Sequence, residues 1–173
     1  YKNMEDELHF ANEIRILELL KENKNVIKIG LVDWTRLTIQ MELACKGSLT
    51  TCLHDENVNE RNIKFICKQI LDGLEFIHSQ GIVHLDVKPD NILVATNYIV
   101  KYSDFNLSRK FKEVNSDCAA FTAYYAPFEH FYNNSGFDEK RAVQGDVWGA
   151  LATLYYVQNR CNFISLTEEE ENE

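Results

Sequence analysis

The chain has 173 residues, of which 45% are hydrophobic and 26% are charged, and its formal net charge is −9 at pH 7. This composition predicts one globular domain with a hydrophobic core and excludes a disordered or fibrous chain. The acidity argues against a nucleic-acid-binding surface, because phosphate binding requires clustered Lys and Arg. Five glutamates in the segment 168–173 supply more than half of the net charge, and we predict a solvated acidic tail there.

Cysteine usage and hydropathy indicate the cellular compartment and the class of protein. No apolar run is long enough to span a bilayer, so we expect no membrane span. The five cysteines are widely spaced and form no C-x-x-C pair, which disfavours a zinc cage and predicts reduced thiols in a cytoplasmic or nuclear compartment. The chain begins with Tyr1 rather than Met, so we expect it to be an internal piece of a longer protein.

Hydrophobic periodicity and turn residues predict the elements in chain order. They are a helix over 5–23, strands over 26–32 and 37–43, a short helix ending at Leu53, a helix over 59–79, short strands over 82–83, 92–94 and 98–102, an irregular stretch over 104–129 and a helix over 146–157. Asn59 is a predicted N-cap, and Gly81 is expected to end the long helix. The order of elements indicates an α+β fold with most helices in its later part.

The first predicted helix and the long one each carry an apolar stripe at helical spacing. In the helix over 5–23 the stripe consists of Leu8, Ala11, Ile14, Leu17 and Leu20. In the helix over 59–79 it consists of Ile63, Ile66, Ile70, Leu74 and Ile77. Both stripes are predicted to face the core.

The segment 84–91, with the sequence HLDVKPDN, resembles the catalytic loop H-R-D-L-x-x-x-N of eukaryotic-type protein kinases. The resemblance implies that Asp86 orients the acceptor hydroxyl and takes its proton. Lys88 would neutralise charge on the transferred phosphate, and Asn91 would give a neutral oxygen ligand to a metal. His84 would be a packing residue beneath the loop. Because Lys88-Pro89 follows the Asp, a Ser/Thr kinase is favoured over a Tyr kinase.

Asp104-Phe105-Asn106 resembles the D-F-G element of the same family. Asp104 would hold Mg²⁺ beside Asn91, and Phe105 would point inward. Asn106 replaces the glycine, and Asn is among the residues that best tolerate a left-handed φ. The implied cofactors are ATP and Mg²⁺.

Two upstream segments resemble the nucleotide-binding parts of the family's small lobe. Glu13 looks like the helix glutamate that pairs with the ATP-binding Lys. Met41 looks like the gatekeeper, and Glu42, Leu43 and Ala44 look like the hinge that holds adenine.

Downstream, residues 126–129 (APFE) resemble the A-P-E element with Phe128 inserted. Asp146-Val147-Trp148 resembles the start of the family's buried central helix, whose Asp fastens the backbone of the catalytic loop. Leu85 replaces the catalytic-loop Arg that receives an activating phosphate in the family. We therefore predict weak or no control through phosphorylation of Ser116 or Thr122.

The resemblance divides the chain into a partial small lobe (1–43), a partial large lobe (44–167) and the acidic tail (168–173). The implied fold is the two-lobe protein kinase fold, truncated at both ends and mainly helical in the large lobe. Neither G-x-G-x-x-G nor V-A-I-K occurs in these residues, so we expect the chain alone to bind ATP weakly.

Two functions are weighed from the sequence. The first is a Ser/Thr kinase whose intact parent phosphorylates a protein substrate, because Asp86, Lys88, Asn91 and Asp104 are all retained. The alternative is a pseudokinase or truncated decoy, a scaffold that binds another kinase or a regulatory protein. A metal-dependent hydrolase using Asp86 and Asp104 is disfavoured, since no His cluster accompanies them.

Overall fold

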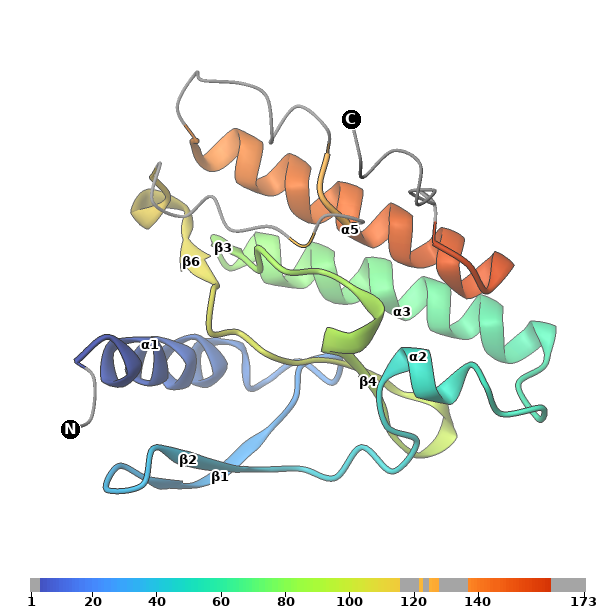
Figure 1. Cartoon of the computed structure of the whole chain (residues 1–173), viewed down its shortest axis with the longest axis horizontal. Coiled ribbons are helices and arrows are strands. Elements are labelled where there is room, and N and C mark those ends of the chain that lie inside the picture. The colour runs from blue at the N-terminus through green and yellow to red at the C-terminus, as the bar shows by residue number, and fades with distance from the viewer. Residues whose placement is uncertain (1–3, 116–121, 123–124, 128–136, 163–173) are drawn as a thin grey trace, which may run out of the picture.

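The computed structural model describes residues 4–115, 122, 125–127 and 137–162 (Figure 1). Its helices and strands are, in chain order, α1 (Met4–Leu20), β1 (Ile29–Asp33), β2 (Thr38–Met41), α2 (Leu49–Cys52), α3 (Glu60–Ser79), β3 (Ile82–Val83), β4 (Ile92–Val94), β5 (Val100–Tyr102), β6 (Arg109–Lys110) and α5 (Glu139–Asn159). Short 3-10 turns lie at Pro89–Asn91, Thr96–Tyr98 and Phe111–Glu113. The mixed α+β architecture agrees with the fold class predicted from the sequence.

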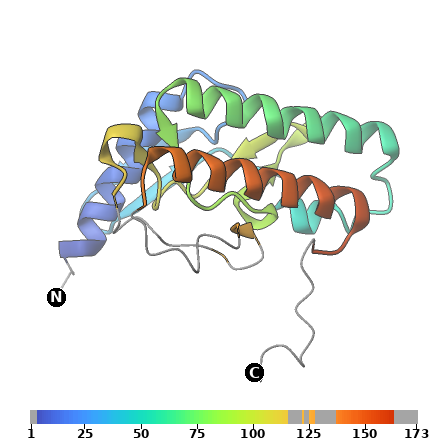
Figure 2. The same cartoon turned by 90° about the horizontal axis from the view of Figure 1, so that it is seen from above.

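The short strands lie between two groups of larger elements (Figures 1 and 2). On one side, α1 lies near the β1–β2 hairpin; on the other, α3 and α5 pack side by side. The described strands form three antiparallel pairs, β1–β2, β3–β6 and β4–β5. The segment 84–91 connects β3, which packs against α3 and α5, to β4.

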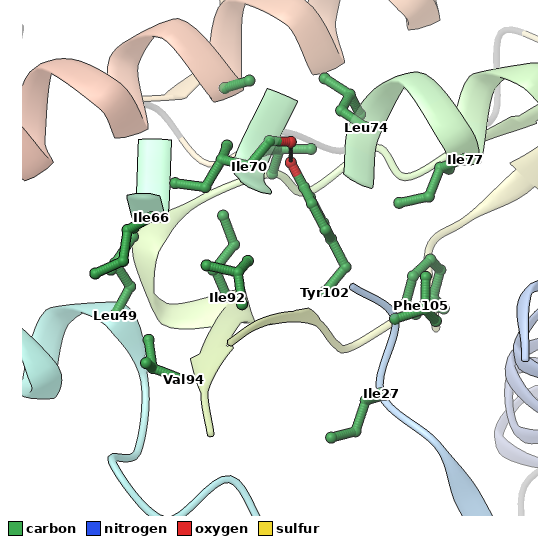
Figure 3. Packing of buried hydrophobic residues seen from close by; sticks show 14 of the residues in the cluster. Ile27, Leu49, Ile66, Ile70, Leu74, Ile77, Ile92, Val94, Tyr102 and Phe105 are labelled. Carbon is green, nitrogen blue, oxygen red and sulfur yellow. Dashed lines mark hydrogen bonds between the residues drawn. The ribbon is translucent and has the colours of Figure 1, made fainter. Parts of the chain in front are cut away.

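The main core forms where α3 meets β4 and β5 (Figure 3). Ile66, Ile70 and Ile77 are fully buried, as the helical spacing of the α3 stripe predicts. Tyr102 is also fully buried, and its hydroxyl donates a hydrogen bond of 2.8 Å to the Ile70 carbonyl oxygen. This bond satisfies the phenol inside the core and fixes β5 against the helix.

Both ends of α3 follow the prediction. Asn59 accepts from the backbone N–H of Asn62 at 3.0 Å, and the Asn62 side chain accepts from the Asn59 N–H at 3.1 Å, which completes a capping box. Gly81 follows the helix with a φ of +69°, a conformation that glycine adopts without a steric penalty.

The boundaries of α1 and α5 differ from the prediction. The first helix ends at Leu20 rather than at 23, and only its C-terminal part enters the core, because Leu8 is 70% exposed. The last helix begins at Glu139 rather than at 146, because the Asp138 carboxylate caps it by accepting from the Arg141 N–H at 2.9 Å. Helix periodicity alone did not reveal this capping residue.

The strands are also shorter than predicted. Val26 and Ile27 are buried and lie outside β1; the Ile27 N–H instead donates to the Tyr102 carbonyl at 2.9 Å. The predicted strand over 98–102 is reduced to β5, since a 3-10 turn occupies its beginning. The stretch expected to be irregular contains β6 and the turn Phe111–Glu113.

None of the helices in the described ranges has the length and hydropathy needed to cross a bilayer.

Candidate active site

The segment 84–91 is anchored at its start by a buried aromatic contact. His84 is fully buried, and its ring centroid lies 5.8 Å from that of Tyr102 and 4.7 Å from that of Phe105. Its Nε2 lies 3.0 Å from the Ser103 carbonyl oxygen. Burial lowers the pKa of His84 and outweighs the opposing effect of the nearby carboxylates. His84 is therefore a packing residue, as the sequence suggested.

The carboxylate of Asp146, on α5, holds the same segment from below. Its two oxygens accept from the backbone N–H groups of His84 and Leu85, each at 2.7 Å. His78, at the end of α3, places its Nε2 2.9 Å from the same carboxylate. Asp146 is almost fully buried, so these bonds compensate for the removal of its charge from water. The predicted fastening of the loop by Asp146 is confirmed.

Four side chains meet above this anchored loop. Lys88 Nζ lies 2.7 Å from Asp86 Oδ2, and Asn91 Nδ2 donates to the same oxygen at 2.7 Å. The Thr122 hydroxyl donates to Asp86 Oδ1 at 2.6 Å and accepts from Lys88 Nζ at 3.1 Å. The cluster is half-buried, and it surrounds one carboxylate with an ammonium, an amide and a hydroxyl.

These neighbours set the charge state of Asp86. Burial acts to raise the pKa of the Asp86 carboxyl, but the hydrogen bonds from Lys88, Thr122 and Asn91 together outweigh burial. The pKa of Asp86 is therefore lowered below its usual value, and the group is an anion at neutral pH. An anionic carboxylate with a hydroxyl already hydrogen-bonded to it can orient an alcohol and accept its proton.

Strand pairing brings the second acidic loop to the first. Ile92 pairs with Tyr102 across β4 and β5, and just beyond that pair the Ser103 N–H and hydroxyl both donate to the Asn91 carbonyl, at 2.9 and 2.8 Å. Asp104 follows immediately with a φ of +59°. The charges of both Asp86 and Asp104 act on the pKa of His84, which begins the first loop and packs against Phe105 of the second.

Glu13 reaches this region from α1. It is half-buried, and burial followed by repulsion from Asp104 raises the pKa of its carboxyl, while a hydrogen bond from the Phe105 backbone N–H opposes the rise. The carboxylates of Glu13 and Asp104 therefore lie close enough to repel each other. Such a pair is suited to a cation, either a metal or a basic group.

The chain crosses from β2 to the large helices through residues 41–47. Met41 ends β2 and is partly exposed, and Leu43 is 85% exposed. The Glu42 carboxylate turns toward β5, where Lys101 Nζ donates to it at 2.7 Å. The Glu42 N–H is also engaged, with the Lys28 carbonyl at 2.9 Å. Within the described residues, the backbone N–H and C=O of Leu43 have no hydrogen-bond partner.

The model of the protein kinase domain family matches residues 1–173, the whole chain. The chain belongs to the protein kinase family. Its relatives include the mitogen-activated protein kinase kinase kinase A of Dictyostelium discoideum, 37% identical over 63% of this chain and 12% of the relative. The serine/threonine-protein kinase STK11 of Gallus gallus is 31% identical over 87% of this chain and 36% of the relative. The mitogen-activated protein kinase kinase kinase 15 of Mus musculus is 38% identical over 82% and 11%. The chain thus spans 11% to 36% of these relatives' lengths.

Within this kinase domain, the predicted site residues form three groups. Asp86, Lys88 and Asn91 touch one another directly. Asp104 and Glu13 interact electrostatically at the next loop. The hinge residues 41–44 form a separate strand-to-helix connection, in which the Glu42 side chain faces Lys101. The Glu42 carboxylate and N–H are therefore both engaged by other residues of the chain.

The structure adds two facts about individual residues of the kinase domain. The left-handed φ lies at Asp104 and not at Asn106, so the replacement of glycine by Asn106 meets no steric penalty of that kind. The Thr122 hydroxyl is part of the Asp86 cluster, and weak or no control through phosphorylation of Ser116 or Thr122 stays a prediction. Ser116, the A-P-E residues 128–129 and the acidic tail 168–173 lie outside the described residues.

The donor set of the kinase site fits Mg²⁺. Asn91 uses its amide N–H groups on Asp86, which leaves its side-chain oxygen as the part able to ligate a metal. Asp104 adds a carboxylate that already repels Glu13, and a cation would relieve this repulsion. Oxygen ligands of these two kinds are the ones that Mg²⁺ prefers.

Proposed function

We propose that this kinase domain, in its full-length protein, transfers the γ-phosphoryl group of ATP to a Ser or Thr hydroxyl of a protein substrate. One observation carries the proposal most directly: the Thr122 hydroxyl lies 2.6 Å from the Asp86 carboxylate and 3.1 Å from Lys88 Nζ. These contacts mean that the cluster already binds an alcohol beside a base and a cation. The similarity to serine/threonine-protein kinases supports the same class of acceptor.

The proposed role of each residue follows from its contacts. Asp86 accepts a hydrogen bond from the acceptor hydroxyl and takes its proton as the new O–P bond forms and the bond to the leaving ADP oxygen breaks. Lys88 stands beside the same carboxylate and offers positive charge to the transferred group. Asn91 and Asp104 would hold Mg²⁺, which supplies neutralisation of the phosphate oxygens when bound.

The hinge and α1 provide the proposed nucleotide contacts. The unpartnered N–H and C=O of Leu43 suit the donor and acceptor edge of a purine, and Met41, Glu42 and Ala44 flank that position. Glu13 would bind a cationic side chain or a metal, which would relieve the repulsion between its carboxylate and that of Asp104. These roles belong to the proposal, as does the existence of further partners such as another kinase or a regulatory protein.

The test measures γ-phosphate incorporation into Ser- and Thr-containing protein substrates by the full-length protein. Asp86→Asn should reduce kcat by about 10²–10⁴-fold, because it removes the proton acceptor. Asp72→Asn is the matched control, since Asp72 is an exposed carboxylate paired with Lys68 on the outer face of α3. Equal incorporation by wild type and Asp86→Asn would contradict the proposal. A wild type that shows no transfer and no Mg-ATP-dependent thermal shift would instead favour the scaffold function.

A further inference from the structure

Across the gap between α1 and the segment that follows Asp104, the structure has a bidentate ion pair. Arg15 Nη1 and Nη2 donate to the two carboxylate oxygens of Glu113 at 2.9 and 2.7 Å. The Nη2 group also donates to Asn12 Oδ1 at 2.8 Å. Bidentate guanidinium–carboxylate geometry is directional, so the pair fixes an orientation as well as a distance.

The pair is one end of a connected series of hydrogen bonds. Asn12 Nδ2 donates to the Ser108 carbonyl at 2.8 Å, and the Ser108 hydroxyl donates to the His84 carbonyl at 3.0 Å inside the core. Glu113 is thereby linked through Arg15, Asn12 and Ser108 to the first residue of the catalytic loop. Figure 2 shows the turn Phe111–Glu113 beside α1.

The electrostatics favour a persistent contact. Hydrogen bonding by Arg15 lowers the pKa of the Glu113 carboxyl, so both partners stay charged at neutral pH. The side chains remain 45% and 32% exposed, and an isolated pair of that exposure contributes little to stability. A bidentate pair within a network is the exception to that rule, and its effect is on geometry more than on global stability.

Glu13, whose carboxyl is repelled by Asp104, lies on α1 between Asn12 and Arg15 of this network. A shift of α1 along the segment would change the separation between Glu13 and Asp104. The ion pair resists such a shift at the distal end, where Glu113 lies.

We propose that Arg15 and Glu113 are positioning residues that hold α1 and Glu13 in register with Asp104. The proposal rests on the proposed function for its kinetic consequence, because Asp104 and Glu13 act on Mg-ATP there. Because the partner of Arg15 is the Glu113 carboxylate of the chain itself, holding α1 in this position needs no added phosphate. The pair touches neither the acceptor hydroxyl nor Asp86, so its effect falls on nucleotide use.

The test is a charge-reversal cycle in the full-length protein. Arg15→Glu and Glu113→Arg should each raise KM for Mg-ATP about 3–10-fold and leave KM for the protein substrate within twofold. Combining the two substitutions should restore KM for Mg-ATP to within about twofold, because an ion pair of reversed polarity forms again. Reversal of the exposed pair Glu18–Lys21, at the C-terminal end of the same helix, is the matched control and should change neither constant.

Amide hydrogen exchange gives a second readout that needs no catalysis. Each single reversal should accelerate exchange at Phe105–Ser108, and the combined variant should restore the wild-type rate. If the combined variant restores the exchange rate but the protein transfers no phosphate, the proposed function is refuted and the positioning role of Arg15 and Glu113 is still supported. Single variants that match wild type in exchange, or a combined variant that stays as impaired as the singles, would overturn it.

Discussion

The catalytic loop and the boundary between α1 and the segment 105–113 are held in opposite ways. The loop is fastened by buried contacts, since Asp146 accepts two backbone N–H groups at 2.7 Å from within the core. The α1 boundary is closed by hydrogen bonds that are open to water, with the Arg15–Glu113 pair at its outer end. Buried contacts leave little freedom, whereas exposed polar contacts can be exchanged for water at small cost. The groups proposed to handle the proton are therefore held by buried bonds, whereas the position of those proposed to handle the nucleotide depends on a pair that is exposed to water.

Among substitutions outside the Asp86 cluster, the largest effect is expected at Gly149, where α5 approaches the catalytic loop closely. A Cβ placed there would lie 2.6 Å from the Val87 carbonyl oxygen, so Gly149→Ala must displace either α5 or the catalytic loop. We expect kcat to fall on the order of 10²-fold, because misplacement by about 1 Å has that effect on positioned groups. We also expect a loss of about 1–3 kcal/mol of stability from overpacking.

Kinase activity and thermal unfolding of Gly149→Ala measure both effects. Gly30→Ala is the control, since the nearest atom to its Cβ would be the flexible Gln40 side chain at 3.5 Å. In an unobstructed helix, Ala replaces Gly with a gain of up to about 1 kcal/mol. A Gly149→Ala protein that is more stable and equally active would therefore show that the close approach is not a constraint.

The difference between the two regions also explains what the sequence could predict. Asp86, Lys88 and Asn91 lie within six positions of one another, so a local motif was enough to group them. The anchoring role of Asp146 was inferred from a short motif as well, and its two backbone bonds confirm it. Local patterns work well where the chain itself holds the residues close.

Contacts between distant residues were not predictable in this way. Arg15 and Glu113 are separated by 98 positions. Arg15 lies in the segment that resembles the small-lobe helix, but that resemblance gives Arg15 no partner. Thr122 joins Asp86 across 36 positions, and the residues around it gave no spacing from which to infer the contact. Gly149 carries no signal in the sequence, because its constraint comes from the Val87 carbonyl of the distant segment 84–91.

An intermediate effect is expected from Thr122, which lies at the top of the rigid cluster. Thr122→Val removes a hydrogen bond to a charged group, which contributes roughly 1.5–3 kcal/mol, so kcat should fall about 10–100-fold. Thr122→Ser keeps the hydroxyl and should stay within about threefold of wild type. Equal kcat values for the Val and Ser variants would contradict a role for the hydroxyl.

The same substitution should move the pH profile. The Thr122 hydroxyl is one of the donors that keep the pKa of Asp86 below its usual value. Losing it raises the pKa of Asp86, so protonation inactivates the base at a higher pH than in wild type. The acid limb of kcat/KM against pH should therefore shift upward in Thr122→Val and stay in place in Thr122→Ser.

The smallest effect is expected at Glu13, on the α1 side of the boundary with the segment 105–113. Burial and repulsion from Asp104 raise the pKa of Glu13 in the folded chain above its usual value. A carboxyl whose pKa is higher in the folded state than in the unfolded state stabilises the fold fully at a pH below the unfolded-state pKa. This stabilisation is lost as the pH rises through the folded-state pKa. Glu13→Gln removes the repulsive charge and should raise the Tm of the 173-residue chain by about 1–3 °C at pH 7.

The gain should vanish below about pH 4, where Glu13 is protonated and resembles Gln. Glu7→Gln, on an exposed position of the same helix, controls for the loss of one negative charge. A fall in Tm for Glu13→Gln at pH 7 would mean that the carboxylate is stabilised by a cation and not opposed by Asp104. The region would then resemble the catalytic loop, where each charge has a fixed partner, and the contrast between the two halves of the site would disappear.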